Sequence, residues 1–576
     1  MRSILAGALV LAALGPIRRG SGQDAFLGRL PSEPTTQLRL DNPKQFLAEL
    51  RRSKVVRVFD DDVVSYLAER LPGSPVWEQF RSSFTPMRDP ELAPLFAKVW
   101  EVVSRSEGQL CAAGGGVEFE TDVGELGWTL LAVDVEEEGS EELRSTVLEL
   151  CRRGGFEQVE GSVEFDGKRR ALMHRGKKQQ LEPFVSGGKL WLIWGTRLAE
   201  RLAQRPAEPV RGLLAGRTEQ LVMTMDAGAL VRSALAAGAA RYPKALTPLV
   251  EAMKVGEFGR FTCSLAARDN HLVLGLDLGL PKAGLARDLL SGLFPVEADA
   301  RALLPRMLRD FRFACIWTID AGRLWNAGIE ATRLRMDPDG VAGVDLKDQL
   351  KRQLGFDLET DLVDQLDGGI LDVQVFWPDA VEGSKDDRQV GPRQRILNIG
   401  VRDPKAVLAT IDRELRRRGL HAAEGSPEEC GDVTIQRLPF LPGAELCYAV
   451  AGKRLLVEFG GRSGRLVRAM IDREAGLGEA GGGWQPGEAL AGQLALLPGP
   501  PGMLLFLDMP GVLEDMSELL VPGLGMRPRD QEDDEEREQL EEVTTRVCDL
   551  IRKQGIRNSI FTAGTNDTGL WFRMIW

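Results

Sequence analysis

The sequence contains few of the side chains that most often perform catalysis or bind metals. Its 576 residues include three histidines, three tyrosines and seven cysteines. His174, His271 and His421 occur in unrelated contexts, and none of the patterns G-x-S-x-G, H-E-x-x-H or C-x-x-C is present. These absences disfavour a catalytic triad, a zinc site and a redox pair. The sequence therefore predicts no catalytic residue, no metal and no cofactor.

The cysteines are too scattered for a disulfide framework, which would be denser and even in number. Cys430 and Cys447 are close enough in sequence to pair across neighbouring strands. The alternative is that all seven are buried free thiols, which behave as small apolar side chains.

Basic residues are fewer than acidic residues, with 73 Lys and Arg against 85 Asp and Glu. The formal net charge is −12 and the sequence pI is about 5.2. Binding to nucleic acid through a general basic surface requires local positive charge opposite the phosphates. We therefore expect no nucleic-acid partner.

Long apolar runs are absent except near the N-terminus. Arg2 precedes the apolar run Ile4–Leu14, and Gly20-Ser21-Gly22 supplies small residues before Gln23. This layout is typical of a secretory signal peptide, here residues 1–22, and the run is too short to span a bilayer. We expect an exported protein, periplasmic or extracellular, with no transmembrane segment after cleavage. An uncleaved anchor and an ordinary buried helix are the alternatives.

A repeated stretch organises the rest of the chain. Glu-Leu-Cys-Arg-Arg-Gly at 149–154 recurs as Glu-Leu-Arg-Arg-Arg-Gly at 414–419, and Gly188-Lys189 recurs as Gly452-Lys453 about 264 residues later. A register held over such a span indicates duplication. We predict a first half at 23–285 and a second half at 286–576, with Gly188 superposed on Gly452. Strands at 370–377 and 395–401 are expected to match 117–120 and 128–135.

The pattern of the elements favours an α+β fold. Strands occur as hairpins and pairs with short turns, and regular alternation of strand and helix with long buried runs is absent, which disfavours a doubly wound parallel sheet. We expect two tandem homologous halves, each a mainly antiparallel sheet with helices packed on one face.

An apolar strand followed by an aspartate recurs along the chain, at Asp60, Asp226, Asp320 and Asp508. Carboxylates at strand ends can form sites. The competing interpretation, which we favour, is that they cap the free N–H groups that open the next helix. Arg152, Arg153, Arg417 and Arg418 lie in predicted last helical turns, where cations suit the helix dipole. They are weak candidates for an anion site.

One stretch resembles a recurring signature of an uncharacterised family of large exported bacterial proteins, a domain of unknown function. It is Leu354-Gly355-Phe356-Asp357-Leu358, with Asp361-Leu362 and Leu366 following, and it is accompanied by Leu303-Leu304-Pro305 and Thr318-Ile319-Asp320. The resemblance implies an envelope location and no activity. Physically, Gly355 is expected to stop one helix and Asp357 to cap the next.

Three functions remain open. We favour a non-catalytic, exported scaffold or binding protein with an unknown envelope partner or ligand. The alternatives are a hydrolase-type enzyme with acidic residues between the halves, and a carrier of an apolar ligand lined by Trp191, Trp194, Trp571 and Trp576.

Overall fold

The computed structural model divides into two compact units. Unit 1 comprises Met1–Tyr242 and Val255–Gly279, and unit 2 comprises Pro243–Lys254 and Leu280–Trp576. The structure describes residues 32–54, 57, 93–116, 118–119, 124–125, 127–136, 139–204, 213–214, 219–236, 246–268, 271–308, 311, 313–338, 345–375, 394–417, 419, 427–441, 444–461, 464–476, 484–508, 510, 545–546, 548–549, 551–553 and 558–576. The predicted signal peptide 1–22, Asp60 and Arg418 lie outside these ranges.

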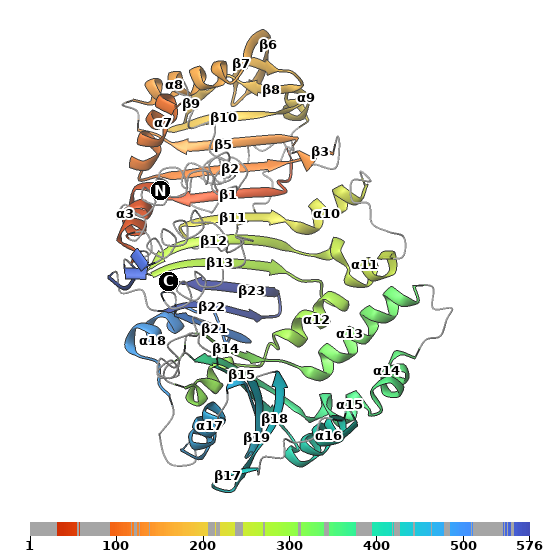
Figure 1. Cartoon of the computed structure of the whole chain (residues 1–576). Helices are drawn as coiled ribbons and strands as arrows, with labels where there is room; N and C mark the ends of the chain where they lie inside the picture. Colours follow the sequence, from red (N-terminus) through yellow and green to blue (C-terminus); the bar gives the residue numbers. More distant parts are fainter. Residues whose placement is uncertain are drawn as a thin grey trace, which may run out of the picture. The chain divides into compact units, whose positions relative to one another are not determined.

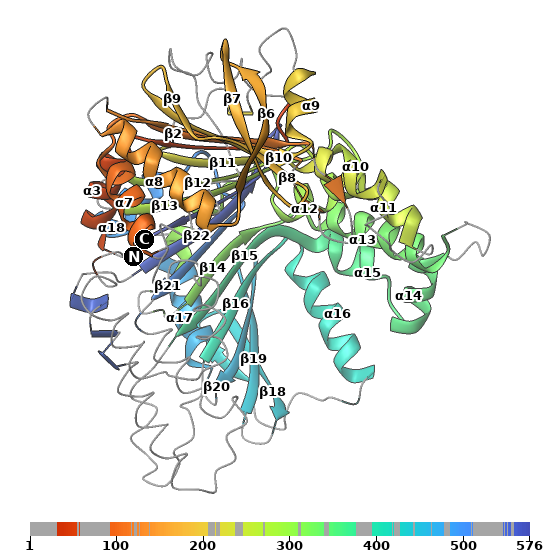
Figure 2. The ribbon, with the colours of Figure 1, turned by 90° about the horizontal axis from the view of Figure 1, so that it is seen from above.

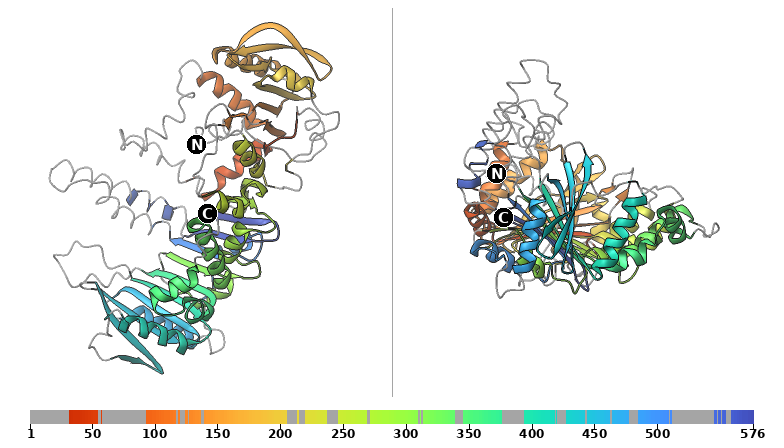
Figure 3. Two further views of the ribbon diagram at one scale, coloured as in Figure 1. Left: turned by 90° about the vertical axis from the view of Figure 1, so that its right-hand side faces the viewer. Right: turned by 60° about the horizontal axis from the view of Figure 1, so that its bottom comes forward.

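Unit 1 is built on an antiparallel sheet (Figure 1). The strand order is β13-β12-β11-β1-β2-β5-β10, after which β9 and β8 share the next position and β7 and β6 follow. The strands are β1 (Thr36–Asp41), β2 (Gln109–Gly115), β5 (Trp128–Asp134), β6 (Glu157–Phe165), β7 (Lys168–Arg175), β8 (Lys178–Leu181), β9 (Phe184–Ser186), β10 (Lys189–Thr196), β11 (Leu221–Asp226), β12 (Arg260–Arg268) and β13 (His271–Gly279). The hairpin β6–β7 forms the outer edge (orange, Figure 3).

Both faces of this sheet are apolar at β10, because alternate residues of a strand point to opposite sides. Trp191 and Ile193 pack in one core with Leu198 and Leu202 of α9 (Leu198–Ala203). Leu190 belongs to a second core. That core also contains Val99 of α7 (Ala93–Arg105) and Leu143 and Val147 of α8 (Ser140–Arg153). Helices therefore pack on both faces of the sheet, and the expectation of a single covered face is wrong in this detail.

Unit 2 contains a second antiparallel sheet, with the order β23-β22-β21-β14-β15-β16-β20-β19-β18-β17. The strands are β14 (Phe313–Thr318), β15 (Leu366–Val375), β16 (Gln394–Val401), β17 (Glu428–Cys430), β18 (Val433–Leu441), β19 (Ala444–Ala451), β20 (Arg454–Gly461), β21 (Met503–Asp508), β22 (Asn558–Thr565) and β23 (Gly569–Ile575). The predicted α+β class with largely antiparallel sheets is confirmed.

Two helices flank the central strands of unit 2 on opposite sides (Figure 2). Val407 and Ile411 of α16 (Pro404–Arg417) pack against Leu455 and Val457 of β20. Glu458, the residue after Val457, points the other way and accepts hydrogen bonds from the first turn of α17 (Arg465–Gly476). A separate helical layer is formed by α11 (Thr247–Met253), α12 (Leu285–Leu293) and α13 (Ala321–Met336), which share one apolar cluster.

The two units share an order of strands, but the repeat read from the sequence does not keep its register. Gly187 and Gly452 each hold the first turn position before β10 and β20, with φ of 61° and 57°. Gly452 thus corresponds to Gly187, not to Gly188 as predicted. One residue of slip matters because it exchanges the two faces of a strand. The duplication itself stays a prediction.

One predicted strand match is also wrong. The strand that pairs with β5 in unit 1 is β2 at 109–115. The described residues of the predicted strand at 117–120 form β3 (Glu118–Phe119), which pairs with β4 (Gly124–Glu125). The strand β2 is difficult to predict from the sequence, because the small residues Ala112, Ala113 and Gly114 lack the bulky apolar pattern that is typical of a strand.

None of the seven cysteines is in a disulfide, so Cys430 and Cys447 are not paired with each other. Within the described ranges, no helix has the length and apolarity needed to cross a membrane.

Candidate functional site

The predicted aspartates bind backbone N–H groups where their helices are described. Asp320 is the N-cap of α13 and accepts from the N–H of Arg323 at 2.9 Å. Asp226 ends β11 and accepts from the N–H of Ala229 at 2.7 Å. Asp508 ends β21, but the helix predicted to follow it lies outside the described residues. Each observed contact is the kind that a helix cap makes.

Within each unit, the described arginines among those proposed as anion ligands do not converge on one site. Arg153 pairs with Glu149 within α8 at 2.8 Å, and Arg152 is exposed beside it. Arg417 pairs with Glu414 at 2.9 Å and donates to the carbonyl of Gln353 at 3.2 Å. The carbonyl is an orphan acceptor near the end of α14 (Leu346–Leu354), so the role of Arg417 here is to join α16 to α14.

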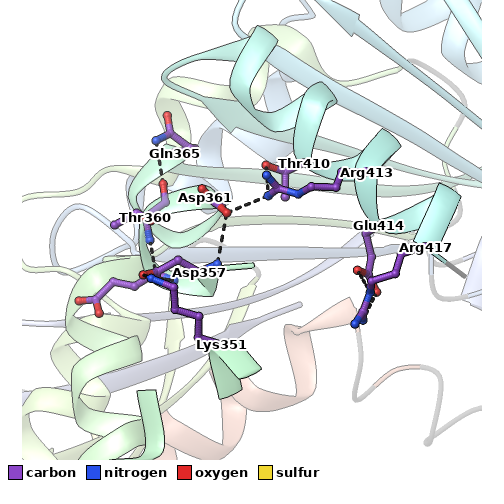
Figure 4. A network of polar contacts seen from close by, with 10 residues as sticks. Lys351, Asp357, Thr360, Asp361, Gln365, Thr410, Arg413, Glu414 and Arg417 are labelled. Atoms are coloured by element: carbon purple, nitrogen blue, oxygen red, sulfur yellow. Dashed lines mark hydrogen bonds and ion pairs between the residues drawn. The ribbon is translucent and has the colours of Figure 1, made fainter. Parts of the chain in front are cut away.

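The family-like signature forms the contact between these helices (Figure 4). Gly355 ends α14 with φ of 75°, and Asp357 caps α15 (Leu358–Asp361) by accepting from the N–H groups of Glu359 and Thr360. The hydrogen bond from Lys351 is the main reason that the pKa of Asp357 lies below its usual value.

The same contact extends to α16. Arg413 donates to Asp361 at 2.8 Å, and its guanidinium lies 5.7 Å from the centre of the Phe356 ring. The signature is thus a helix-docking element that leads the chain through η6 (Val363–Gln365) into β15.

An open pocket of about 590 Å³ lies where β14 ends and β15 begins. Besides small and apolar residues, it is lined by the acids Glu297, Asp299, Asp320, Asp364 and Asp367 and by the bases Arg402 and Arg454. Asp299 forms an ion pair with Arg301, at 2.7 Å. Arg402 donates to the carbonyl of Asp364 at 3.1 Å. Both arginines keep their charge, so with Asp299 paired to Arg301 the lining still has four acids against two bases.

Arg454 is the buried charge of this pocket, with a side chain that is 6% exposed. Its Nη2 donates to the carbonyls of Gly369 and Asn398, at 3.0 and 2.9 Å, and its Nε donates to the Asn398 side chain. Its Nη1 lies 3.7 Å from Asp367 Oδ2, which is beyond hydrogen-bond distance. Burial lowers the pKa of Arg454 from its ordinary value, yet an arginine remains protonated in proteins.

A bulge positions the carboxylate opposite this arginine. Asp367, Gly368 and Gly369 lie across from the single residue Gly400, because the register of β15 on β16 shifts between Leu366 and Ile370. Asp367 accepts from the N–H of Gly369 at 2.9 Å. A Cβ on Gly400 would lie 1.6 Å from Asp367 Oδ1, so only glycine admits the carboxylate there. Bulges of this kind often re-aim a side chain beside a site.

Behind Arg454, the polar contacts continue into the unit. Asn398 is fully buried and donates to Glu474 of α17 at 3.1 Å, and Glu474 also pairs with Arg306 at the end of η5 (Ala300–Arg306). This network holds the guanidinium of Arg454 rigidly, since each neighbour is itself hydrogen-bonded.

Sequence reasoning found Asp320 but missed Asp367, Arg402 and Arg454. The dipeptide Gly368-Gly369 after an aspartate was the available signal, since paired glycines inside a strand pattern suggest a bulge. Nothing local marks Arg454 as buried. Trp191 and Trp571, proposed to line an apolar groove, are core residues instead.

No family model matches the chain, and no curated protein matches it. Among solved structures, crystal forms III, IV and I of TP0453 resemble it at 12% sequence identity, with TM-scores of 0.22, 0.23 and 0.20. The matches cover 47%, 45% and 45% of this chain and 89%, 83% and 79% of theirs. Scores this low give no argument about fold or function.

Proposed function

We propose that the protein is an exported, non-catalytic binding protein of the cell envelope that receives its ligand or partner in the pocket of unit 2. The observation that supports binding is the way in which the polar groups of the pocket are held. Asp320 caps a helix, Asp367 accepts from its own bulge, and Arg454 is fixed to two strands. Rigid, pre-oriented groups around an open hollow suit recognition.

The export part of this proposal rests on the N-terminal pattern, and the envelope location is also what the family resemblance implies. Mass spectrometry of protein from the native host tests export directly. We expect a mature N-terminus near Gln23, and an intact Met1 in the cytoplasmic fraction would contradict it.

The binding part is tested by filling the pocket. Ala302 lines the pocket and is exposed, so Ala302→Trp adds bulk there without disturbing the core. We expect the full-length variant to lose the partner or ligand that co-purifies with wild-type protein from the native envelope fraction, while Ala302→Ser retains it. Equal recovery with both variants would move the binding site away from this pocket. Turnover of a substrate that Ala302→Trp abolishes would favour the hydrolase alternative.

A further inference from the structure

We propose that the pocket of unit 2 recognises a basic peptide segment, with a lysine or arginine side chain among its carboxylates and a peptide carbonyl on Arg454. This inference rests on the proposed binding function and names the class of ligand. Three exposed acids carry it: Asp320, Asp364 and Asp367 all line the hollow. Asp364 has no side-chain hydrogen bond or ion pair among the described residues, and Asp367 is 40% exposed.

Arg454 is the second, independent observation. Its side chain is buried and its Nε and Nη2 are satisfied by protein, while Nη1 has no acceptor within hydrogen-bond distance in the part of the chain that is described. Nη1 is not among the buried donors that lack a partner, so solvent reaches it from the pocket, and a ligand oxygen can take the place of that water.

The sign of the surrounding charge decides which oxygen this is. A ligand carboxylate at Nη1 would lie beside Asp367 and near Asp320 and Asp364, and like charges in a partly desolvated site repel. A neutral carbonyl meets no such penalty. A peptide supplies both required groups, a carbonyl acceptor and a cationic side chain, a few ångströms apart.

The aliphatic part of such a side chain also has a place. Leu303, Ile319, Val363 and Leu366 contribute apolar surface to the same lining. Lysine and arginine bury their methylene stems on apolar surface while the charged end stays near water or a carboxylate. A free polyamine shares the cationic chemistry but lacks the carbonyl acceptor.

The test measures binding of a fluorescent N-acetylated, amidated hexalysine peptide to the full-length protein at low salt, with spermidine and hexaglutamate as the other two probes. We expect hexalysine to bind, its affinity to fall as salt is added, and spermidine to bind at least about tenfold more weakly, which corresponds to about 1.4 kcal/mol. Asp364→Asn combined with Asp367→Asn should weaken hexalysine binding by about tenfold or more.

The matched control is Asp432→Asn, which removes an exposed charge from the β17–β18 turn of the same unit, outside the pocket lining. We expect it to bind hexalysine like wild type. Equal weakening by Asp432→Asn, no binding of hexalysine, or spermidine binding as tightly as the peptide would each overturn the assignment. Preferential binding of hexaglutamate that Ala302→Trp abolishes would overturn the ligand class and leave the binding function standing.

Discussion

The two units place a cation at the same point of their sheets but hold it with a carboxylate from different strands. Lys189 is the first residue of β10 and lies opposite Asp134 of β5. Arg454 is the first residue of β20 and lies opposite Gly400 of β16. At this position β5 therefore carries an acid in unit 1, whereas the corresponding strand of unit 2, β16, carries a glycine.

The neighbouring strand shows the reverse exchange. In unit 1, Gly108 precedes β2, and a Cβ there would lie 2.3 Å from the Asp134 side chain. In unit 2, Asp367 stands at the start of β15 and fits against Gly400. The acid and the glycine have exchanged strands, while the cation is at the equivalent position in both units. Each unit therefore has one carboxylate, one glycine that makes room for it and one positively charged side chain.

The exchange has a physical result. Asp134 pairs directly with Lys189 and also accepts from the N–H of Gln109, so its carboxylate is engaged, although it lines an open pocket of about 490 Å³ in unit 1. Asp367 stays 3.7 Å from Arg454 and faces an open hollow. The carboxylate is thus bound directly by its cation in unit 1 and held 3.7 Å from it in unit 2. The weaker pairing of Asp367 is why we place the proposed binding site in unit 2.

The largest effect is expected from removing the two cations. Arg454→Met leaves Asn398 and two carbonyls without their donor in a buried place, and we expect the free energy of unfolding to fall by about 3 kcal/mol. Lys189→Met should cost about 1 kcal/mol, because its single carboxylate partner is partly exposed. Urea denaturation followed by tryptophan fluorescence measures both. Equal losses would contradict the difference between the units.

The next effect concerns the fifth residue of the same two strands. Unit 1 has the buried Ile193 there, and unit 2 has Glu458, which is also fully buried and receives hydrogen bonds from Leu466 and Val467 through one oxygen only. Burial raises the pKa of Glu458 above its ordinary value of 4.5. The folded state therefore holds the proton more tightly, and this contribution to stability is lost as pH rises from 4.5 through the raised pKa.

We expect Glu458→Gln to flatten that part of the stability profile and to gain about 1 kcal/mol at pH 8, because Gln keeps an acceptor for α17 without a buried charge. Thermal melts between pH 4 and 8 check this, with the exposed Glu429→Gln as control. A Glu458→Gln profile parallel to wild type would show that another group controls the pH dependence.

An effect of similar size is expected at the caps that follow β1 and β14. Asn42 caps α3 (Pro43–Arg52) in unit 1, and Asp320 caps α13 in unit 2. Asp320→Asn installs the residue type of unit 1 and should leave stability nearly unchanged, whereas Asp320→Ala should cost about 1 kcal/mol. Chemical denaturation distinguishes the two. If Asp320→Asn is as costly as Asp320→Ala, the aspartate charge matters beyond capping.

The smallest effect is expected in the signature, which the first half of the sequence lacks. Arg413→Gln removes the contact with Asp361, but both side chains are substantially exposed, so we expect a loss of about 0.5 kcal/mol. The transition should also become less sensitive to salt. A loss of several kcal/mol would make the docking of α16 a main support of unit 2.

Local patterns predicted the parts of this molecule that local chemistry controls. The α+β class, Asp320 as a cap and Gly355 as a helix end all follow from turns, caps and periodicity within a few residues. The pocket depends instead on contacts between β14, β15 and β20, which are distant in the sequence. The strand β2 was not predicted, because its small side chains lack the usual apolar pattern of a strand. The packing of helices on both faces of the sheets was also not predicted, because it depends on the face against which α9 and α17 pack.

The central strand of each sheet has a neighbour that is distant in the chain. Arg39 of β1 donates to the carbonyl of Glu219, 180 residues away, and Thr318 at the end of β14 donates to that of Gly502, 184 residues away. At a synthesis rate of about 5–20 residues per second, each sheet waits about 10–40 s for the strand that closes it. During that delay β1 and β14 each have one edge that no native strand covers, which is where strands of other chains pair. Completing each sheet is therefore a late, slow step in folding, and it determines how long the nascent chain is open to aggregation.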